Sequence, residues 1–140
     1  MMRLAPIIER LEPVGLRLVE GAVEFAGLSS APTRLPAAYV VPQSDDAAPN
    51  RLGTYAIDQR VTATIAVVLV LDAARRGGGG AVSDELEDWS ERIRDRLIGW
   101  KHPDADTGFE YAGGQLLSAD GTALAWALRF KSARHVRKVG

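Results

Sequence analysis

The two histidines, His102 and His135, have the widest range of possible chemistry in this chain, because imidazole serves both as a proton carrier and as a metal ligand. They lie far apart in the sequence, and neither has another histidine or a cysteine nearby to complete a zinc site. His102 comes shortly after a strongly predicted helix. We therefore predict that it lies at the surface or at the helix end.

Three other patterns that often carry chemistry are incomplete. The glycines at 77–80 are followed by neither Lys-Ser nor Lys-Thr, and no G-x-G-x-x-G is present, so we predict a flexible connector over 72–80. The aspartates at 45–46 and at 104 and 106 lack the ligand spacing of a calcium loop and are expected to be solvated turn residues. No G-x-S-x-G motif marks a nucleophile, although a serine, a histidine and an aspartate from distant segments can assemble in space. We expect no catalytic residue, no metal ligand, no cofactor-binding residue and no enzymatic activity.

The composition narrows the class of protein further. The 140 residues include 17 lysines and arginines against 18 aspartates and glutamates, and this near-neutral balance excludes a generally basic nucleic-acid-binding protein. The absence of cysteine excludes disulfides and thiolate metal sites. The length favours one domain with one core. No apolar run approaches the roughly 20 residues of a membrane span, so we expect no membrane association. Glu9 and Glu12 stand where a signal peptide would be apolar, so we expect no export by a signal peptide.

The first half of the chain is predicted to contain short elements and one long loop. Apolar spacing and turn residues predict a helix at 4–11, a strand at 14–19, a helical stretch at 20–28, a loop at 29–33 and a strand at 36–41 closed by Pro42. The segment 43–53 has no periodicity and is rich in Asp, Pro, Asn and Gly. We predict a surface loop there.

The second half holds the strongest strand signals. Residues 57–71 are rich in β-branched side chains, with one face apolar throughout and the other apolar only in its later part, which predicts a central strand covered on both sides toward its end. Strands at 108–117 and 122–131 are expected to form a hairpin, because Asp120-Gly121 lies in the turn between them.

One strong helix is predicted at 84–98. Leu86, Trp89, Ile93 and Leu97 form its apolar stripe. Ser83 would be its N-cap, and Gly99 would follow its end.

This order of elements predicts an α+β fold, with a single mixed and mostly antiparallel sheet and helices packed on one face. One domain would span residues 1–131. Residues 132–140 have little apolar content, and we predict a mobile, basic C-terminal arm there.

Two segments carry charge of one sign. The acidic segment contains Asp84, Glu85, Glu87, Asp88 and Glu91, and the basic segment contains Arg129, Lys131, Arg134, Arg137 and Lys138. Such runs are most often solvated faces, but opposite charges on two surfaces of one subunit also suit head-to-tail contacts between identical chains. The small side chains of Ala123, Ala125 and Ala127 would let another layer approach the sheet, from the same subunit or from elsewhere.

Several segments, taken in order, resemble the tail terminator proteins of long-tailed bacteriophages. They are APIIERLEPVGLRLVEGAVEFAGL, LPAAYVVP, PNRLG followed by RVTATIAVVLVL, the helix end IRDRLIGW, FEYAGGQLL and WALRF. The similarity extends from about Leu4 to Phe130. Its weight comes from the combination and order of these patterns rather than from any single motif.

The resemblance implies a structural role. Proteins of this kind form a hexameric ring that caps the growing tail tube, ends its polymerisation and offers a joining surface to the head or neck. It also implies a mixed α/β subunit with no enzymatic activity and no required cofactor. The partners would be further copies of the chain, the major tail tube protein and a head-completion or neck protein. Genome DNA would pass through the lumen without specific binding, because strong phosphate contacts would slow its transit. The protein would be located in the virion, at the neck end of the tail, after assembly in the host cytoplasm.

The resemblance also suggests where a subunit meets its neighbours. The candidate interface residues are Asn50, Arg51 and Leu52 in the long loop, Arg75 and Arg76 beside the glycine run, and the acidic and basic residues named above. Three alternatives stay open: a head–tail connector or neck protein of similar size, a small bacterial α+β domain that binds a small molecule or peptide, and a hydrolase with a spatially assembled site.

Overall fold

The computed structural model describes residues 1–28, 34–53, 55–73 and 79–139, with the backbone alone at 79–81. Its helices are α1 (Ala5–Leu11), the 3-10 turn η1 (Glu12–Val14), α2 (Ala22–Ala26) and α3 (Gly79–Leu97). Its strands are β1 (Leu18–Glu20), β2 (Ala37–Ala47), β3 (Ile57–Asp72), β4 (Glu110–Ala119) and β5 (Ala123–Lys138). These strands form one mixed five-stranded sheet, which confirms the predicted α+β fold.

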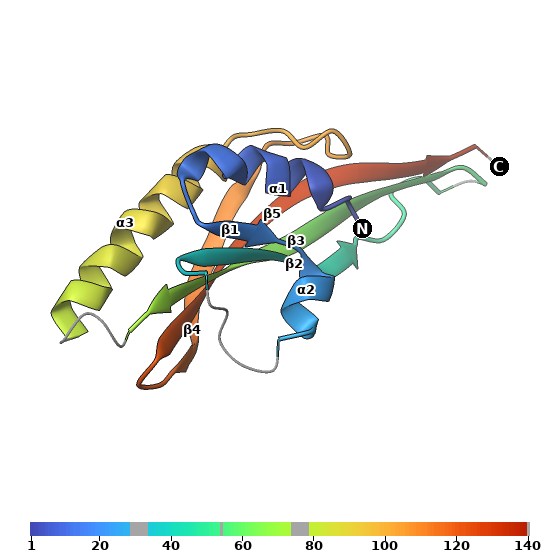
Figure 1. The fold of residues 1–140 in the computed structure, drawn as a ribbon. Coiled ribbons are helices and arrows are strands. Elements are labelled where there is room, and N and C mark those ends of the chain that lie inside the picture. The colour runs from blue at the N-terminus through green and yellow to red at the C-terminus, as the bar shows by residue number, and fades with distance from the viewer. Residues whose placement is uncertain (29–33, 54, 74–78, 140) are drawn as a thin grey trace.

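The strand order is β1-β2-β3-β5-β4, and neighbouring strands are antiparallel except for the parallel pair β1 and β2. β3 and β5 pair along all 16 residues of each strand, from Ile57 opposite Lys138 to Asp72 opposite Ala123. Figure 1 shows the first part of β3 and the last part of β5 extending past the helices as a long ribbon, whereas α3 and the β4–β5 hairpin lie on the other side of the molecule.

The main core lies between one face of the sheet and the helices α1 and α3. The fully buried Ile7 and Leu11 of α1 and Ile93 and Leu97 of α3 pack there with the odd-numbered residues of β3. Each such side chain contributes about 1.5–3 kcal/mol by leaving water. The predicted alternation of the central strand and the apolar stripe of the helix are therefore confirmed.

The opposite face of the sheet carries a second, smaller cluster. Tyr39 of β2 packs there with Val68 of β3, and the Phe25 ring of α2 lies 5.5 Å from the Tyr39 ring. The prediction that helices pack on one face therefore holds for α1 and α3 and is wrong for α2. Ala123 and Ala125 from the small-residue row belong to the same cluster. Part of that row is thus covered within the subunit, and the later half of β3 is buried on both faces as predicted.

β2 continues to Ala47, so the prediction of a loop beginning at residue 43 is wrong for 43–47. The register shifts between Pro42 and Ser44, and the ladder then resumes with Asp45 opposite Ala63. β1 pairs only with residues 37–39 of β2. Beyond them, no strand of the described residues pairs with this side of β2, and Pro42 lies in this edge segment next to the register shift, a position where proline is tolerated.

The C-terminal segment also differs from the prediction. Residues 132–138 continue β5 and pair with β3, so the expected mobile arm is wrong for them. The pairing takes place because the first half of β3 offers a partner for every residue of this segment. What projects from the body of the subunit is a hydrogen-bonded ribbon rather than a loose tail.

α3 begins earlier than predicted. It starts at Gly79, so Gly79 and Gly80 are helical and Ser83 lies inside the helix instead of at its N-cap. Gly99 has a positive φ of +80° and ends the helical segment as expected.

Candidate assembly surfaces

The first candidate surface is the end of the β3–β5 ribbon with the loop that joins β2 to β3. We call it the ribbon end, and it consists of the described residues of 44–60 and 133–139. Asn50 Oδ1 accepts hydrogen bonds from the backbone N–H of Leu52 at 3.2 Å and of Asp58 at 2.8 Å, and its Nδ2 donates to the carbonyls of Leu52 and Ala56 at 2.6 and 3.2 Å. Asn50 therefore shapes the loop that carries Leu52.

A buried carboxylate gathers basic side chains at the ribbon end. Asp58 is 4% exposed, and it accepts hydrogen bonds from Arg51 Nε at 2.6 Å and from His135 Nδ1 at 3.1 Å, with Arg137 Nε 3.6 Å away. Burial by itself raises the pKa of Asp58, but the hydrogen bonds from Arg51 and His135 and the charges of Arg51 and Arg137 together lower that pKa below its ordinary value. The carboxylate is ionised at neutral pH and fixes Arg51 and Arg137 in place.

Arg134 ties β5 to β2 across the intervening β3. Its two terminal nitrogens donate to the two carboxylate oxygens of Asp45 at 2.9 and 2.7 Å. The hydrogen bonds from Arg134 hold the pKa of Asp45 below its ordinary value, although partial burial opposes the shift. Asp45 is exposed as expected, but it lies in strand β2 and not in a turn, and its partner Arg134 serves the subunit itself.

Arg129 and Lys131 of β5 lie nearer the body of the sheet. Arg129 donates hydrogen bonds to Gln43 and Gln115, each at 2.9 Å, and Lys131 Nζ lies 4.0 Å from a carboxylate oxygen of Glu110. Arg129 of β5 thus connects to β4 on one side and, across the intervening β3, to β2 on the other, and its charge is held close to the sheet surface.

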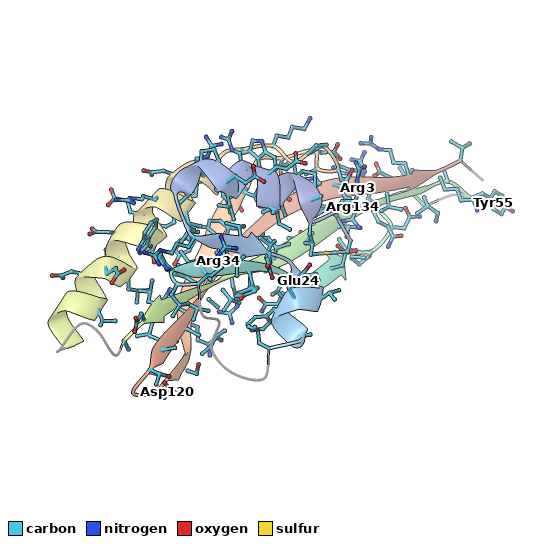
Figure 2. All side chains as sticks on the ribbon, in the orientation of Figure 1. Arg3, Glu24, Arg34, Tyr55, Asp120 and Arg134 are labelled. Carbon is cyan, nitrogen blue, oxygen red and sulfur yellow. The ribbon has the colours of Figure 1, made fainter. Side chains whose placement is uncertain are left out.

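Apolar side chains are exposed at the ribbon end. Tyr55 is 94% exposed, Val139 93%, Val136 43% and Leu52 39%. Figure 2 shows Tyr55 at the far tip of the molecule. Large apolar groups that gather at one end of a subunit are typical of a contact surface.

The second candidate surface is the stretch 84–91 of α3, where Asp84, Glu87, Asp88 and Glu91 are exposed. Glu87 accepts a hydrogen bond from Arg94 at 2.6 Å, and this bond raises the pKa of Arg94. The structure thus places four of the five predicted acidic interface residues in solvent on one helix. Arg75 and Arg76 lie outside the described residues.

Beside this acidic stretch of α3 lies an apolar groove that sequence reasoning missed. It has a volume of about 490 Å³, and its lining includes Val82 and Leu86 of α3, Leu116 of β4, and Leu124 and Trp126 of β5. The groove depends on how α3 meets the hairpin, so no local pattern reveals it. The adjacent Leu116 and Leu117 of the edge strand were the available signal, since both are apolar and are 49% and 46% exposed.

A glycine in β4 makes room for the wall of this groove. A Cβ at Gly114 would lie 2.7 Å from Trp126 Nε1 and 2.9 Å from the Tyr111 hydroxyl. Only glycine therefore allows the Trp126 ring to lie close against β4.

His102 is fully buried, so the prediction of a surface position is wrong. Its Nδ1 accepts a hydrogen bond from the Asp104 backbone N–H at 2.9 Å, which leaves the ring proton on Nε2 to donate to the Arg3 carbonyl at 2.6 Å. The Asp104 carboxylate binds the Arg3 guanidinium at 2.7 and 3.1 Å, and these bonds hold the pKa of Asp104 well below its usual range. This cluster ties the N-terminus to the segment after α3, and neither ring nitrogen of His102 is available as a base.

The described ranges of the chain contain no group of three or more His, Cys, Asp or Glu side chains placed to hold a metal ion. None of the helices in those ranges is long and apolar enough to cross a membrane. The two candidate contact surfaces are the ribbon end and the surface of α3 with its adjacent groove. They make the subunit a candidate assembly protein.

The comparisons with known proteins agree with that class. The chain matches the family model of the phage tail terminator protein over residues 1–139, and it belongs to this family. The predicted family is thus confirmed, and the chain is a structural protein of a phage-like tail, which places it in the virion. A chain in the virion of a native gene transfer agent particle shares its fold with a TM-score of 0.50 and 15% identity, over 91% of this chain and 84% of that chain. No curated protein matches.

Proposed function

We propose that copies of this chain form a hexameric ring that caps the tail tube, ends tube polymerisation and provides the joining surface for the head or neck. The family match over residues 1–139 is the observation that carries the proposal. The mechanism is steric. One face of the ring fits the tube end, and the other face offers no site for a further tube subunit.

The partners in this proposal are other copies of the chain, the major tail tube protein and a head-completion or neck protein. DNA passes through the lumen without specific binding, which the near-neutral charge of the chain supports. The subunit would be located at the neck end of the tail after assembly in the host cytoplasm. No catalytic step and no cofactor enter the mechanism.

The candidate contact residues fall into two groups: those that bind other residues of the same chain, and those that are exposed for contact with a neighbour. Arg51, Arg134 and Arg137 are held by aspartates of the same chain, so they act chiefly by shaping the ribbon end. The exposed Leu52 and Lys138 remain the better contacts with a neighbour.

Electron microscopy of growing tubes tests this function. Tube protein of the same particle is polymerised with and without the purified chain, and native mass spectrometry of the chain is recorded in parallel. We expect tubes that stop lengthening and carry a ring at one end, and a six-copy species in the mass spectrum. Tubes of unchanged length, together with a strict monomer at every concentration and in the presence of tube protein, would refute the proposal.

A further inference from the structure

We propose that the apolar groove between α3 and the β4–β5 hairpin of one copy receives the ribbon end of a second copy. This inference rests on the proposed ring and specifies which two surfaces of the chain join its subunits.

The groove has the chemistry of a docking site for an apolar group. Leu86, Leu124 and Trp126 line it and are only partly buried, and Leu116 at its edge is 49% exposed. Covering these side chains would remove apolar surface from water, which favours association. The groove therefore favours an occupant with apolar side chains of its own.

The ribbon end supplies such side chains at an accessible tip. Tyr55 and Val139 are almost fully exposed there, and Val136 is 43% exposed. A tyrosine brings a large apolar ring with a polar hydroxyl and loses little conformational freedom on binding, which makes it a frequent anchor at protein interfaces.

The charges around the two surfaces are complementary. Exposed Asp84, Asp88 and Glu91 lie on the same helix as the groove-lining Val82, Ser83 and Leu86, and helical spacing places these acidic residues on the side of α3 that faces away from the groove. The exposed cations Arg60 and Lys138 accompany the apolar groups at the ribbon end. Opposite charges near two apolar surfaces steer their encounter. A second copy of this chain therefore offers both an apolar group for the groove and a positive charge that is attracted to α3.

The two surfaces cannot meet within one subunit. Figure 1 shows the ribbon end and the hairpin at opposite ends of the fold, and in Figure 2 Tyr55 and Asp120 mark these two ends. β3 and β5 are paired along their full lengths, so the ribbon does not fold back. Two different surfaces at opposite ends produce a head-to-tail contact, which repeats from copy to copy and closes into a ring when the rotation per copy allows it.

Cross-linking through introduced cysteines tests this pairing, because the chain has no cysteine of its own. Tyr55→Cys places a thiol at the ribbon tip, and Ser83→Cys places one at an exposed residue in the groove wall. The two single variants are mixed, allowed to assemble and treated with a short bis-maleimide. The product is analysed by denaturing gel electrophoresis and by mass spectrometry of the linked peptides.

We expect heterodimers linked between positions 55 and 83 in the mixture, and a ladder of linked copies when both cysteines are in one chain. A matched control with Glu12→Cys in place of Ser83→Cys, an exposed position on η1, should give no link to position 55. If six-copy rings form but position 55 never links to position 83, the inference is wrong while the proposed ring stands. If position 83 links to tube protein instead, the groove belongs to the tube and the inference is overturned. If no rings form with the wild-type chain, alone or with tubes, the proposed function itself fails.

Charge exchange provides a second, independent readout. Asp84→Lys with Asp88→Lys should lower the ring fraction at least tenfold, as should Arg60→Glu with Lys138→Glu. Mixing the two reversed chains should restore association between them, which a loss of folding would not allow. Glu9→Lys with Glu12→Lys, at exposed positions on α1 and η1, is the matched control and should leave the ring fraction unchanged. Failure of the mixed chains to associate, with each chain folded by circular dichroism, would contradict the docking arrangement.

Discussion

Replacing Gly114 by alanine tests the packing of the groove wall. The added methyl group would lie 2.7 Å from Trp126 Nε1 and 2.8 Å from Trp126 Cζ2, well inside the optimal separation of about 3.5–4.0 Å. The Trp126 ring packs against the main core and must shift. Overpacking of this kind costs about 1–3 kcal/mol. For a domain of this size each kcal/mol lowers the melting temperature by about 3–4 °C, so we expect a decrease of about 3–12 °C.

Thermal unfolding followed by circular dichroism and tryptophan fluorescence measures this effect. Gly121→Ala is the matched control, because a Cβ at Gly121 meets no atom within 4 Å and its φ is not positive. The control should change the free energy of unfolding by less than about 0.5 kcal/mol. A Gly114→Ala protein that melts within 1 °C of the wild type, roughly a third of the smallest expected shift, with unchanged fluorescence, would refute the assigned position of the Trp126 ring.

Three further predictions concern what holds the subunit together. Leu97→Ala, at a fully buried position of α3, should lower the free energy of unfolding by about 2–5 kcal/mol in denaturant titrations. Arg134→Gln should cost about 0.5–1 kcal/mol, since the pair with Asp45 is partly exposed, and a double-mutant cycle with Asp45→Asn should show the coupling; additive effects would contradict the pair. The lowered pKa values of Asp45 and Asp104 give stability that is present above about pH 4 and is lost as the pH falls through the folded-state pKa values. Denaturant unfolding at a series of pH values should therefore show stability falling in acid, and falling less steeply for Asp104→Asn.

The periodicity of apolar residues was sufficient to predict a helix or strand wherever the buried side chains repeat with the period of that helix or strand. The alternation in 57–71 predicts β3 because its two faces meet different clusters, and the stripe from Leu86 to Leu97 predicts the buried side of α3. The Asp120-Gly121 turn likewise predicts the hairpin, where Asp120 accepts hydrogen bonds from the backbone N–H groups of Thr122 and Ala123. In these segments local preference and tertiary packing agree.

The prediction failed where a distant partner decides the structure. The basic segment after Phe130 looks like a tail when read alone, but the first half of β3 pairs with it residue by residue. His102 and Asp104 look solvated, yet their partner Arg3 comes from the other end of the chain. No local pattern carries such pairings, because each is fixed by a contact between segments that lie far apart in the sequence.

The rigidity of the ribbon has a consequence for the proposed ring. A disordered basic arm would lose conformational entropy on docking and would reach neighbours over a range of angles. β5 is instead hydrogen-bonded to β3 up to Lys138, and the Arg134–Asp45 pair braces it against β2. The angle between the ribbon end and the groove is therefore set within each subunit before assembly, which lowers the cost of binding. In a head-to-tail ring this fixed angle determines how many copies close the circle, so the pairing between β3 and β5 would determine the ring size.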